Sequence, residues 1–247
     1  MIDVVRDYWL YFLVGQYPAG PLGGLALTVA LAALALAGAL PVGILLGLAR
    51  ISPWRALRWP VTALVYVVRG VPLLMVIFWA YFFLPAVTGV KTGQFSTMLA
   101  ALVLFDGVYL AEIVRAGIRG VPRGQVEAAR ALGLGWGRTM RRVVLPQALR
   151  SMLPSLVNQF VSTIKETSLG YIIGLGEVSF IASQVNTQVF THATEVYGIL
   201  GLTYFVLCFG LSRVAFLLER RLNRRPGAAR PRDDAVAPAN PLATPNA

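Results

Sequence analysis

The sequence predicts an all-α, polytopic membrane protein with about five transmembrane helices. Its 247 residues are 57% hydrophobic and only 13% charged, whereas soluble domains are roughly 25% charged. A helix that spans the bilayer needs about 20 predominantly apolar residues, and five segments approach that requirement. In chain order they are residues 22–48, 60–84, 97–114, 150–175 and 197–218. The second and fourth are interrupted by polar or helix-breaking residues.

The distribution of arginines predicts how these helices are oriented. Loops on the cytoplasmic side of a membrane protein carry an excess of Lys and Arg. The loops after the first and third spans and the C-terminal tail are rich in arginine, whereas the opposite side holds only Arg6 and Lys91 as cations. We therefore expect the N-terminus outside and the C-terminus in the cytoplasm. The net charge of +11 follows from this topology and does not indicate nucleic acid binding.

These spans divide the chain into three parts. Residues 1–21 lack the basic start of a signal peptide, so we expect them to be retained as an extracytoplasmic segment with its aromatic side chains at the level of the lipid headgroups. Residues 22–222 form the transmembrane domain, with a cytoplasmic loop at about 115–150. Residues 223–247 are rich in Pro, Ala and charge and are expected to be disordered.

Several classes of function are excluded by what the sequence lacks. One cysteine, Cys208, and one histidine, His192, cannot build a disulfide framework or a metal site of Cys and His ligands. No G-x-x-x-x-G-K-[ST] string is present to cradle a nucleotide, and neither the H-E-x-x-H nor the G-x-S-x-G pattern of hydrolytic enzymes occurs. We therefore expect no cofactor, no metal and no enzymatic activity of the chain itself.

Residues 127–146, "EAARALGLGWGRTMRRVVLP", form a long basic interruption of an apolar chain. Pro122 suits the start of a helix, and Gly133 suits the left-handed residue that ends it. A second short helix is expected from near Trp136 to Leu145, because the next residue is a proline and biases Leu145 away from the helical region. From these features alone, the segment is either a loop that fixes topology and contacts anionic headgroups or a folded device.

This segment resembles the cytoplasmic EAA motif of ABC importer permeases, which reads E-A-A, three residues, G, nine residues, then I-x-L-P. The matching residues, with Val143 in place of the isoleucine, are Glu127, Ala128, Ala129, Gly133, Leu145 and Pro146. The resemblance implies that the segment docks onto a separate ATPase subunit, so the missing nucleotide motif becomes an expected absence. Glu127 is then expected to cap its helix or pair with nearby arginines, and the two alanines to keep that helix slim.

Three further stretches resemble the polar amino acid branch of this family, which takes up glutamate, glutamine, histidine and arginine. They are "VVRGVPLLMVIFWAYFFLP" at 67–85, "AEIVRAGIRGVPRGQVEAARALG" at 111–133 and "IKETSLGYIIGL" at 164–175. The resemblance implies a type I ABC importer permease fold in the bacterial plasma (inner) membrane. It also implies four kinds of partner: two ATP-binding cassette subunits, a second permease subunit, an extracytoplasmic amino acid binding protein and the amino acid itself.

Ionisable residues at membrane depth predict where a substrate passes, because burying each of them costs a few kcal/mol or more. A zwitterionic amino acid needs an acceptor for its ammonium group and a donor for its carboxylate. The candidate pathway residues are Arg69, Lys165, Glu166, Thr167 and Ser168. Lys165 and Glu166 point about 100° apart unless their helix is broken, and Gly70 and Pro72 are expected to break the second span.

Other interpretations of these residues stay open. The charges at membrane depth could instead pair across helices and hold the bundle together. Asp106 is expected to be structural, while Glu112 and Arg115 are expected to form a gate or to anchor the basic loop. A secondary transporter or channel that works alone, a membrane enzyme and a non-transporting scaffold are the rival functions for the chain as a whole.

Overall fold

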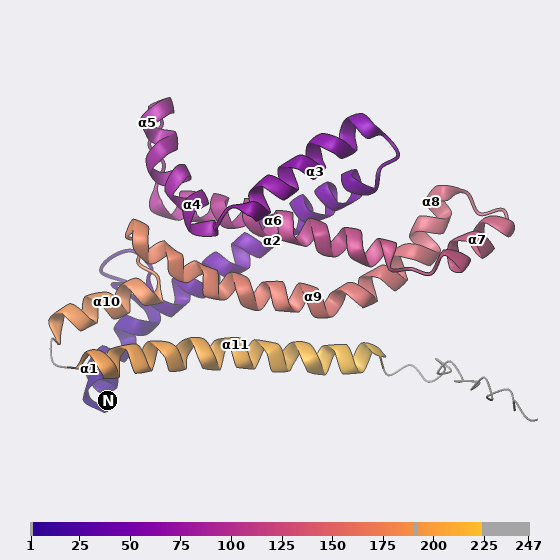
Figure 1. Cartoon of the computed structure of the whole chain (residues 1–247). Coiled ribbons are helices and arrows are strands. Elements are labelled where there is room, and N and C mark those ends of the chain that lie inside the picture. The colour runs from indigo at the N-terminus through magenta and orange to yellow at the C-terminus, as the bar shows by residue number, and fades with distance from the viewer. Residues whose placement is uncertain (1, 190–191, 224–247) are drawn as a thin grey trace, which may run out of the picture.

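The computed structural model describes residues 2–189 and 192–223, and helices dominate that part of the chain (Figure 1). Its backbone pairing outside helices is limited to two isolated bridges, Gly15 with Leu22 and Gly24 with Glu177, so the prediction of an all-α fold is confirmed. The elements in order are α1 Ile2–Val14, α2 Gly24–Ile51, α3 Arg55–Gly70, α4 Leu73–Phe78, the π-helical η1 Trp79–Phe83, α5 Leu84–Thr88, α6 Gln94–Arg119, α7 Arg123–Ala131, α8 Trp136–Thr139, the π-helical η2 Met140–Val144, α9 Leu145–Glu166, the 3-10 helix η3 Thr167–Ile173, α10 Val178–Gln188 and α11 Ala193–Asn223.

Three of these helices are long and apolar enough to cross a membrane: α2, α6 and the Ala193–Leu217 part of α11. A fourth crossing is formed if α3 is taken together with Leu73–Thr88, which follows it after a bend of 101°. The span predicted at 150–175 corresponds to α9 and η3. Neither α9 nor η3 is among the helices that are long and apolar enough to cross a membrane, because polar residues interrupt them. The helix α9 nevertheless runs alongside α6 and α11 (Figure 1).

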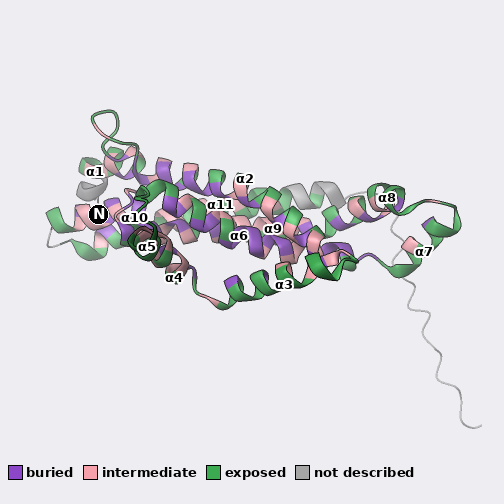
Figure 2. Ribbon diagram, turned by 90° about the horizontal axis from the view of Figure 1, so that it is seen from above, coloured by how far each residue is buried: buried purple, intermediate pink, exposed green. Residues whose placement is uncertain are grey.

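The core lies where α2 packs against α6, and glycines bring the two backbones together. A Cβ atom on Gly43 would lie 2.5 Å from Leu110 Cβ, and one on Gly47 would lie 2.8 Å from Val114 Cβ. Small residues at helix contacts are typical of membrane proteins, where close approach maximises van der Waals packing. Figure 2 shows the resulting distribution, with buried residues concentrated along α2 and α6 and exposed residues over α3, α7 and α8.

The basic loop folds as a helical hairpin, as predicted, but its second half differs from the prediction. Gly133 has φ +76° and ends α7, and α8 starts at Trp136. The expected stop at Leu145 is wrong, because α8 continues through η2 directly into α9. Leu145 N–H donates to Met140 O across the wider π turn, and this local widening accommodates Pro146, which lacks an amide donor of its own.

The two ends of the chain complete the fold. The helix α1 packs on α10 and α11 through Phe12, which is 7% exposed. Glu177 is buried and begins α10 as its N-cap, accepting hydrogen bonds from Ser179 N and Phe180 N at 2.9 Å each. The tail predicted to be disordered lies outside the described residues, apart from Asn223, which ends α11.

Candidate functional site

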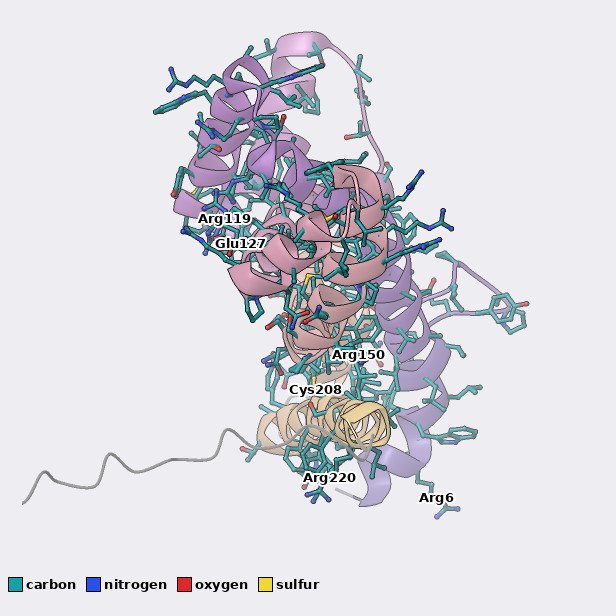
Figure 3. All side chains as sticks on the ribbon, turned by 90° about the vertical axis from the view of Figure 1, so that its right-hand side faces the viewer. Arg6, Arg119, Glu127, Arg150, Cys208 and Arg220 are labelled. Atoms are coloured by element: carbon teal, nitrogen blue, oxygen red, sulfur yellow. The ribbon has the colours of Figure 1, made fainter. Side chains whose placement is uncertain are left out.

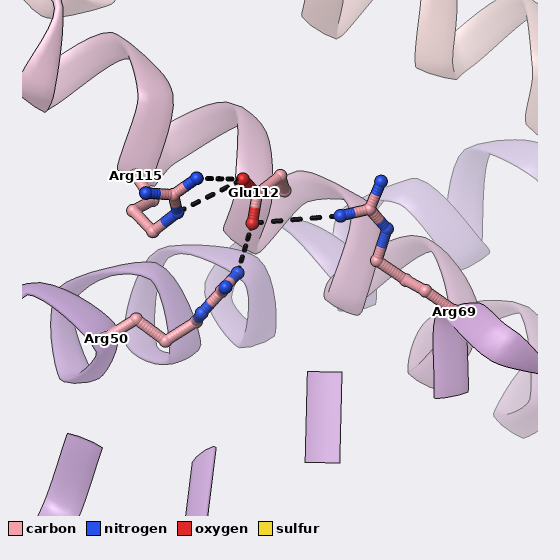
Figure 4. Close-up of polar contacts among 4 residues, drawn as sticks. All are labelled: Arg50, Arg69, Glu112 and Arg115. Atoms are coloured by element: carbon pink, nitrogen blue, oxygen red, sulfur yellow. Dashed lines mark hydrogen bonds and ion pairs between the residues drawn. The ribbon is translucent and has the colours of Figure 1, made fainter. Parts of the chain in front are cut away.

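Glu112 on α6 is surrounded by three arginines from three helices (Figure 4). Arg50, near the end of α2, donates to Oε2 of Glu112 through Nη1. Arg115, one turn further along α6, donates to Oε1 through Nη2, and through Nε at 3.1 Å. Arg69, in the last turn of α3, places Nη1 3.8 Å from Oε2. This Glu112 cluster therefore joins α2, α3 and α6 at one point.

The Glu112 cluster has an excess of positive charge, because three guanidinium groups share one carboxylate. Arg50 is only 4% exposed, and its Nε is buried without a hydrogen-bond partner. Aromatic faces provide part of the compensation: Arg50 lies 5.6 Å from the ring centroid of Tyr66, and Arg69 lies 5.2 Å from that of Tyr109. Such cation–π contacts contribute about 0.5–2 kcal/mol each.

Arg69 lies directly before the break between α3 and α4. Val71 has extended dihedral angles, φ −109° and ψ 135°, and the next residue is Pro72. Proline cannot donate to the preceding turn, and it disfavours a helical conformation in the residue before it. The break expected at Gly70 and Pro72 is therefore confirmed, and the Glu112 cluster lies at a joint in the backbone.

A second polar group lies nearer the start of α6, around Asp106. Asp106 is fully buried and accepts hydrogen bonds from Gln159 Nε2 at 2.7 Å and from Thr163 Oγ1 at 2.9 Å, both on α9. Glu166 neighbours Asp106, and its Oε2 is buried with no hydrogen-bond partner. Asp106 thus ties α9 to α6, as its predicted structural role requires, whereas Glu166 keeps an unused acceptor.

The polar stretch at the end of α9 lies at a change of helix type. The α-helix α9 ends at Glu166, and the chain continues from Thr167 as the 3-10 helix η3. Lys165 and Glu166 are therefore both α-helical and about 100° apart around the helix axis, and the change of helix type comes directly after them. Thr167 Oγ1 donates to Ile164 O at 2.7 Å, and Ser168 Oγ donates to Lys165 O at 2.6 Å. Both hydroxyl groups therefore satisfy carbonyl groups at the end of α9.

The structure thus separates the candidate pathway residues into two groups. Arg69 belongs to the Glu112 cluster, while Lys165, Glu166, Thr167 and Ser168 lie at the junction of α9 and η3. Within the described part of the chain, no hydrogen bond or ion pair joins Arg69 to the second group. The two groups also lie at different levels, since Asp106 and Glu112 are six residues apart on α6, a rise of about 9 Å.

The hairpin formed by α7 and α8 presents a surface that no other described element covers. Leu132 is 82% exposed and Trp136 is 67% exposed, whereas Ala129 is buried at 4%. Glu127 is exposed and forms no hydrogen bond or ion pair with any described residue, so the expectation that it caps its helix or pairs with arginines is wrong. Figure 3 views the molecule from this end, with Glu127 and Arg119 labelled.

Arg50 is the site residue that sequence reasoning missed, because by sequence it belongs to the arginine-rich loop after the first span, which indicates topology only. One signal could have identified it. Gly43, Gly47 and Arg50 follow one another at four and three residues, which places them on the same face of α2. The two glycines pack against α6, so an arginine on the same face also meets α6.

Among the described residues, no group of three or more His, Cys, Asp or Glu could hold a metal ion.

Comparisons with known proteins place the chain in a family. Residues 39–224 match the sequence model of the family described as "binding-protein-dependent transport system inner membrane component". The chain is 38% identical over 224 residues to the inner membrane amino-acid ABC transporter permease protein YhdY of Escherichia coli, covering 87% of this chain and 61% of that one. It is 36% identical over 201 residues to the arginine transport system permease protein ArtQ of Bacillus subtilis, covering 81% of this chain and 91% of that one.

Solved structures show the same fold. A chain from the crystal structure of an amino acid ABC transporter with histidines superposes with a TM-score of 0.77 at 32% identity, covering 80% of this chain and 92% of that one. A chain of the inward-facing MetNI methionine ABC transporter superposes with a TM-score of 0.60 at 23% identity, covering 78% of this chain and 91% of that one. The chain therefore has the type I ABC importer permease fold and belongs to the family of binding-protein-dependent transport system inner membrane components.

Proposed function

We propose that the chain is the transmembrane permease subunit of an ATP-driven importer of polar amino acids. The observation that carries this proposal is the folded hairpin of α7 and α8, which holds the EAA spacing and presents an uncovered surface around Leu132. Relatives named as permeases for arginine, cystine and glutamine support an amino acid substrate. The chain itself carries out no catalysis in this proposal, and a partner subunit hydrolyses ATP.

The proposed assembly pairs this chain with a second permease subunit, two ATP-binding cassette subunits and an extracytoplasmic amino acid binding protein. It lies in the bacterial plasma membrane, crosses it five times within residues 22–222, and has residues 1–21 outside. The arrangement of the basic segments supports this orientation. The connection between α2 and α3, the α7–α8 hairpin and the C-terminal end of α11 all lie at one end of the molecule (Figure 1), as a cytoplasmic side rich in arginine requires.

The uncovered hairpin surface gives a direct test of partner binding. Changing Leu132→Asp places a charge where an apolar contact is expected, and buried anchors at interfaces typically contribute 2 kcal/mol or more. We expect the variant to lose at least tenfold of the ATPase subunit that co-purifies with the wild-type chain. Val90→Asp is the matched control, because Val90 is also exposed, at 62%, but lies between α5 and α6, away from the hairpin. Equal recovery of the ATPase with Leu132→Asp and wild type would contradict the assignment.

Within the proposed pathway, Arg69 and Lys165 serve the carboxylate of the amino acid, and Glu166 serves its ammonium group, with Thr167 and Ser168 beside it. Two observations support this division. Arg69 is 36% exposed beside the helix break, and Glu166 has a buried oxygen without a partner. The alternative is that the charges only hold the bundle together, and the contact of Arg69 with Glu112 is the observation in its support.

Glu166→Gln separates these two roles. A hydrogen bond to a charged group contributes about 1.5–3 kcal/mol, so we expect the KM for amino acid uptake to rise about tenfold or more, with thermal stability close to that of wild type. Glu166→Asp keeps the charge and is expected to recover part of the affinity. The measurement is initial uptake of a labelled amino acid panel into proteoliposomes. A structural role for Glu166 would instead lower the thermal stability and leave the KM of the remaining folded protein unchanged.

A further inference from the structure

A second charged feature lies beside the Glu112 cluster and shares Arg50 and Arg115 with it. A cavity of about 230 Å³ opens between the end of α2, the first turns of α3 and the end of α6. Four arginines and two aromatic side chains supply most of its lining: Arg50, Arg58, Trp59, Tyr66, Arg115 and Arg119. We call this the arginine pocket.

The arginine pocket holds positive charge that the protein does not neutralise. Glu112 is the carboxylate that pairs with Arg50 and Arg115, and in the described part of the chain Arg58 and Arg119 form no ion pair. At the inner wall, Arg50 is 4% exposed and keeps its Nε without a hydrogen-bond partner. A buried donor left unpaired costs about 1–3 kcal/mol, so an acceptor from outside the chain would stabilise this arrangement.

The lining specifies the chemistry of that acceptor. Guanidinium groups offer several donors in a planar fork, which matches the oxygens of phosphate and forms strong charge-assisted hydrogen bonds. The rim includes an exposed aromatic side chain, since Trp59 lines the pocket and is 68% exposed. Tryptophan is enriched where membrane helices meet the headgroup region. An anion that arrives with acyl chains attached fits both the arginines and this rim.

We propose that the arginine pocket binds the phosphate of an anionic phospholipid. The lipid, rather than a soluble anion, is indicated by the exposed Trp59 beside the arginines. If the chain has the proposed orientation, the pocket faces the cytoplasmic leaflet, in which anionic lipids are enriched. The bound lipid would then lie against the Glu112 cluster, which connects α2, α3 and α6. Arg69 of that cluster lies directly before the α3–α4 break.

Tryptophan fluorescence tests the proposal at the pocket itself. The full chain is prepared with Trp59 as its only tryptophan, the others being changed to phenylalanine, and is placed in phosphatidylcholine vesicles that contain a small share of a brominated lipid. We expect brominated phosphatidylglycerol to quench Trp59 several-fold more than the same share of brominated phosphatidylcholine. A chain with Trp54 as its only tryptophan is the matched control and is expected to show little preference, because Trp54 does not line the pocket.

Substitutions identify the groups responsible. Arg58→Gln and Arg119→Gln should each reduce the preference for phosphatidylglycerol about fivefold, the factor expected for one arginine near an anionic surface. Arg55→Gln removes an exposed arginine from the same end of α3 without touching the pocket, and should leave the preference unchanged. Equal quenching of Trp59 by the two lipids, or a preference that survives both substitutions, would overturn the proposal. Displacement of phosphatidylglycerol by inorganic phosphate would assign the pocket to soluble anions and overturn the lipid assignment.

Discussion

Gly133→Val is expected to abolish ATP-driven uptake while the protein remains inserted in the membrane. Gly133 has φ +76° at the end of α7, a conformation that costs an ordinary residue roughly 1–2 kcal/mol and a β-branched residue more. A Cβ atom added here would not clash, since nothing lies within 4 Å of its position. Because no neighbouring atoms surround this position, packing does not hold the backbone of residue 133 in the left-handed conformation. The chain is therefore expected to relieve the strain by changing the angle between α7 and α8.

The measurement is uptake of labelled amino acid by proteoliposomes that contain the complete transporter, together with the amount of inserted protein. Gly135→Val is the matched control, because Gly135 also has open space around it but has an extended backbone, φ −63° and ψ 161°, that valine adopts readily. We expect that control to transport normally. Normal uptake by a stably inserted Gly133→Val variant would remove the hairpin from the coupling mechanism.

Glu112→Gln is expected to have the largest effect on stability. It leaves three guanidinium groups without their shared carboxylate, and Arg50 is 4% exposed and cannot turn to water. Removing one partner of a buried ion pair costs about 3–5 kcal/mol. Because Glu112 is 24% exposed, the loss should lie near the lower limit of that range. The midpoint of thermal unfolding in detergent should therefore fall well below that of the wild-type chain.

Two further variants separate charge from shape at this position. Arg50→Met in the Glu112→Gln background removes the buried charge and is expected to recover much of the loss. Glu127→Gln is the control, because Glu127 is exposed and has no ion pair among the described residues, so its stability should match wild type. A Glu112→Gln variant as stable as this control would show that the Glu112 cluster does not hold the three helices together.

Local backbone chemistry explains the part of this fold that was predictable from sequence. Gly133 was expected to be left-handed, and Gly70 and Pro72 were expected to break the second span. Both expectations are confirmed, because each depends on one or two residues whose dihedral preferences are strong. The same reasoning failed at Pro146. The π-helical η2, in the five residues before Leu145, relieves the constraint that proline imposes. No residue pattern in the local sequence predicts that turn.

The partners of charged residues were harder to predict, because they depend on which helices meet. Arg50 belongs to an arginine-rich loop by sequence, yet the packing of α2 on α6 carries it into the Glu112 cluster. Glu127 has arginines near it in sequence, yet it pairs with none of them. Glu112 was expected to act as a gate or anchor. In the structure Glu112 contacts Arg50 of α2 and Arg69 of α3, so it connects both helices to α6 beside the α3–α4 break.

A secondary transporter or channel that works alone remains the functional rival, and uptake by proteoliposomes distinguishes it most directly. Vesicles would contain this chain and its co-purified subunits, with ATP enclosed on the side of the α7–α8 hairpin and the amino acid binding protein on the other. The account predicts accumulation of a polar amino acid that requires ATP, the ATPase subunit and the binding protein. Accumulation by this chain alone, driven by an ion gradient and indifferent to ATP, would contradict it.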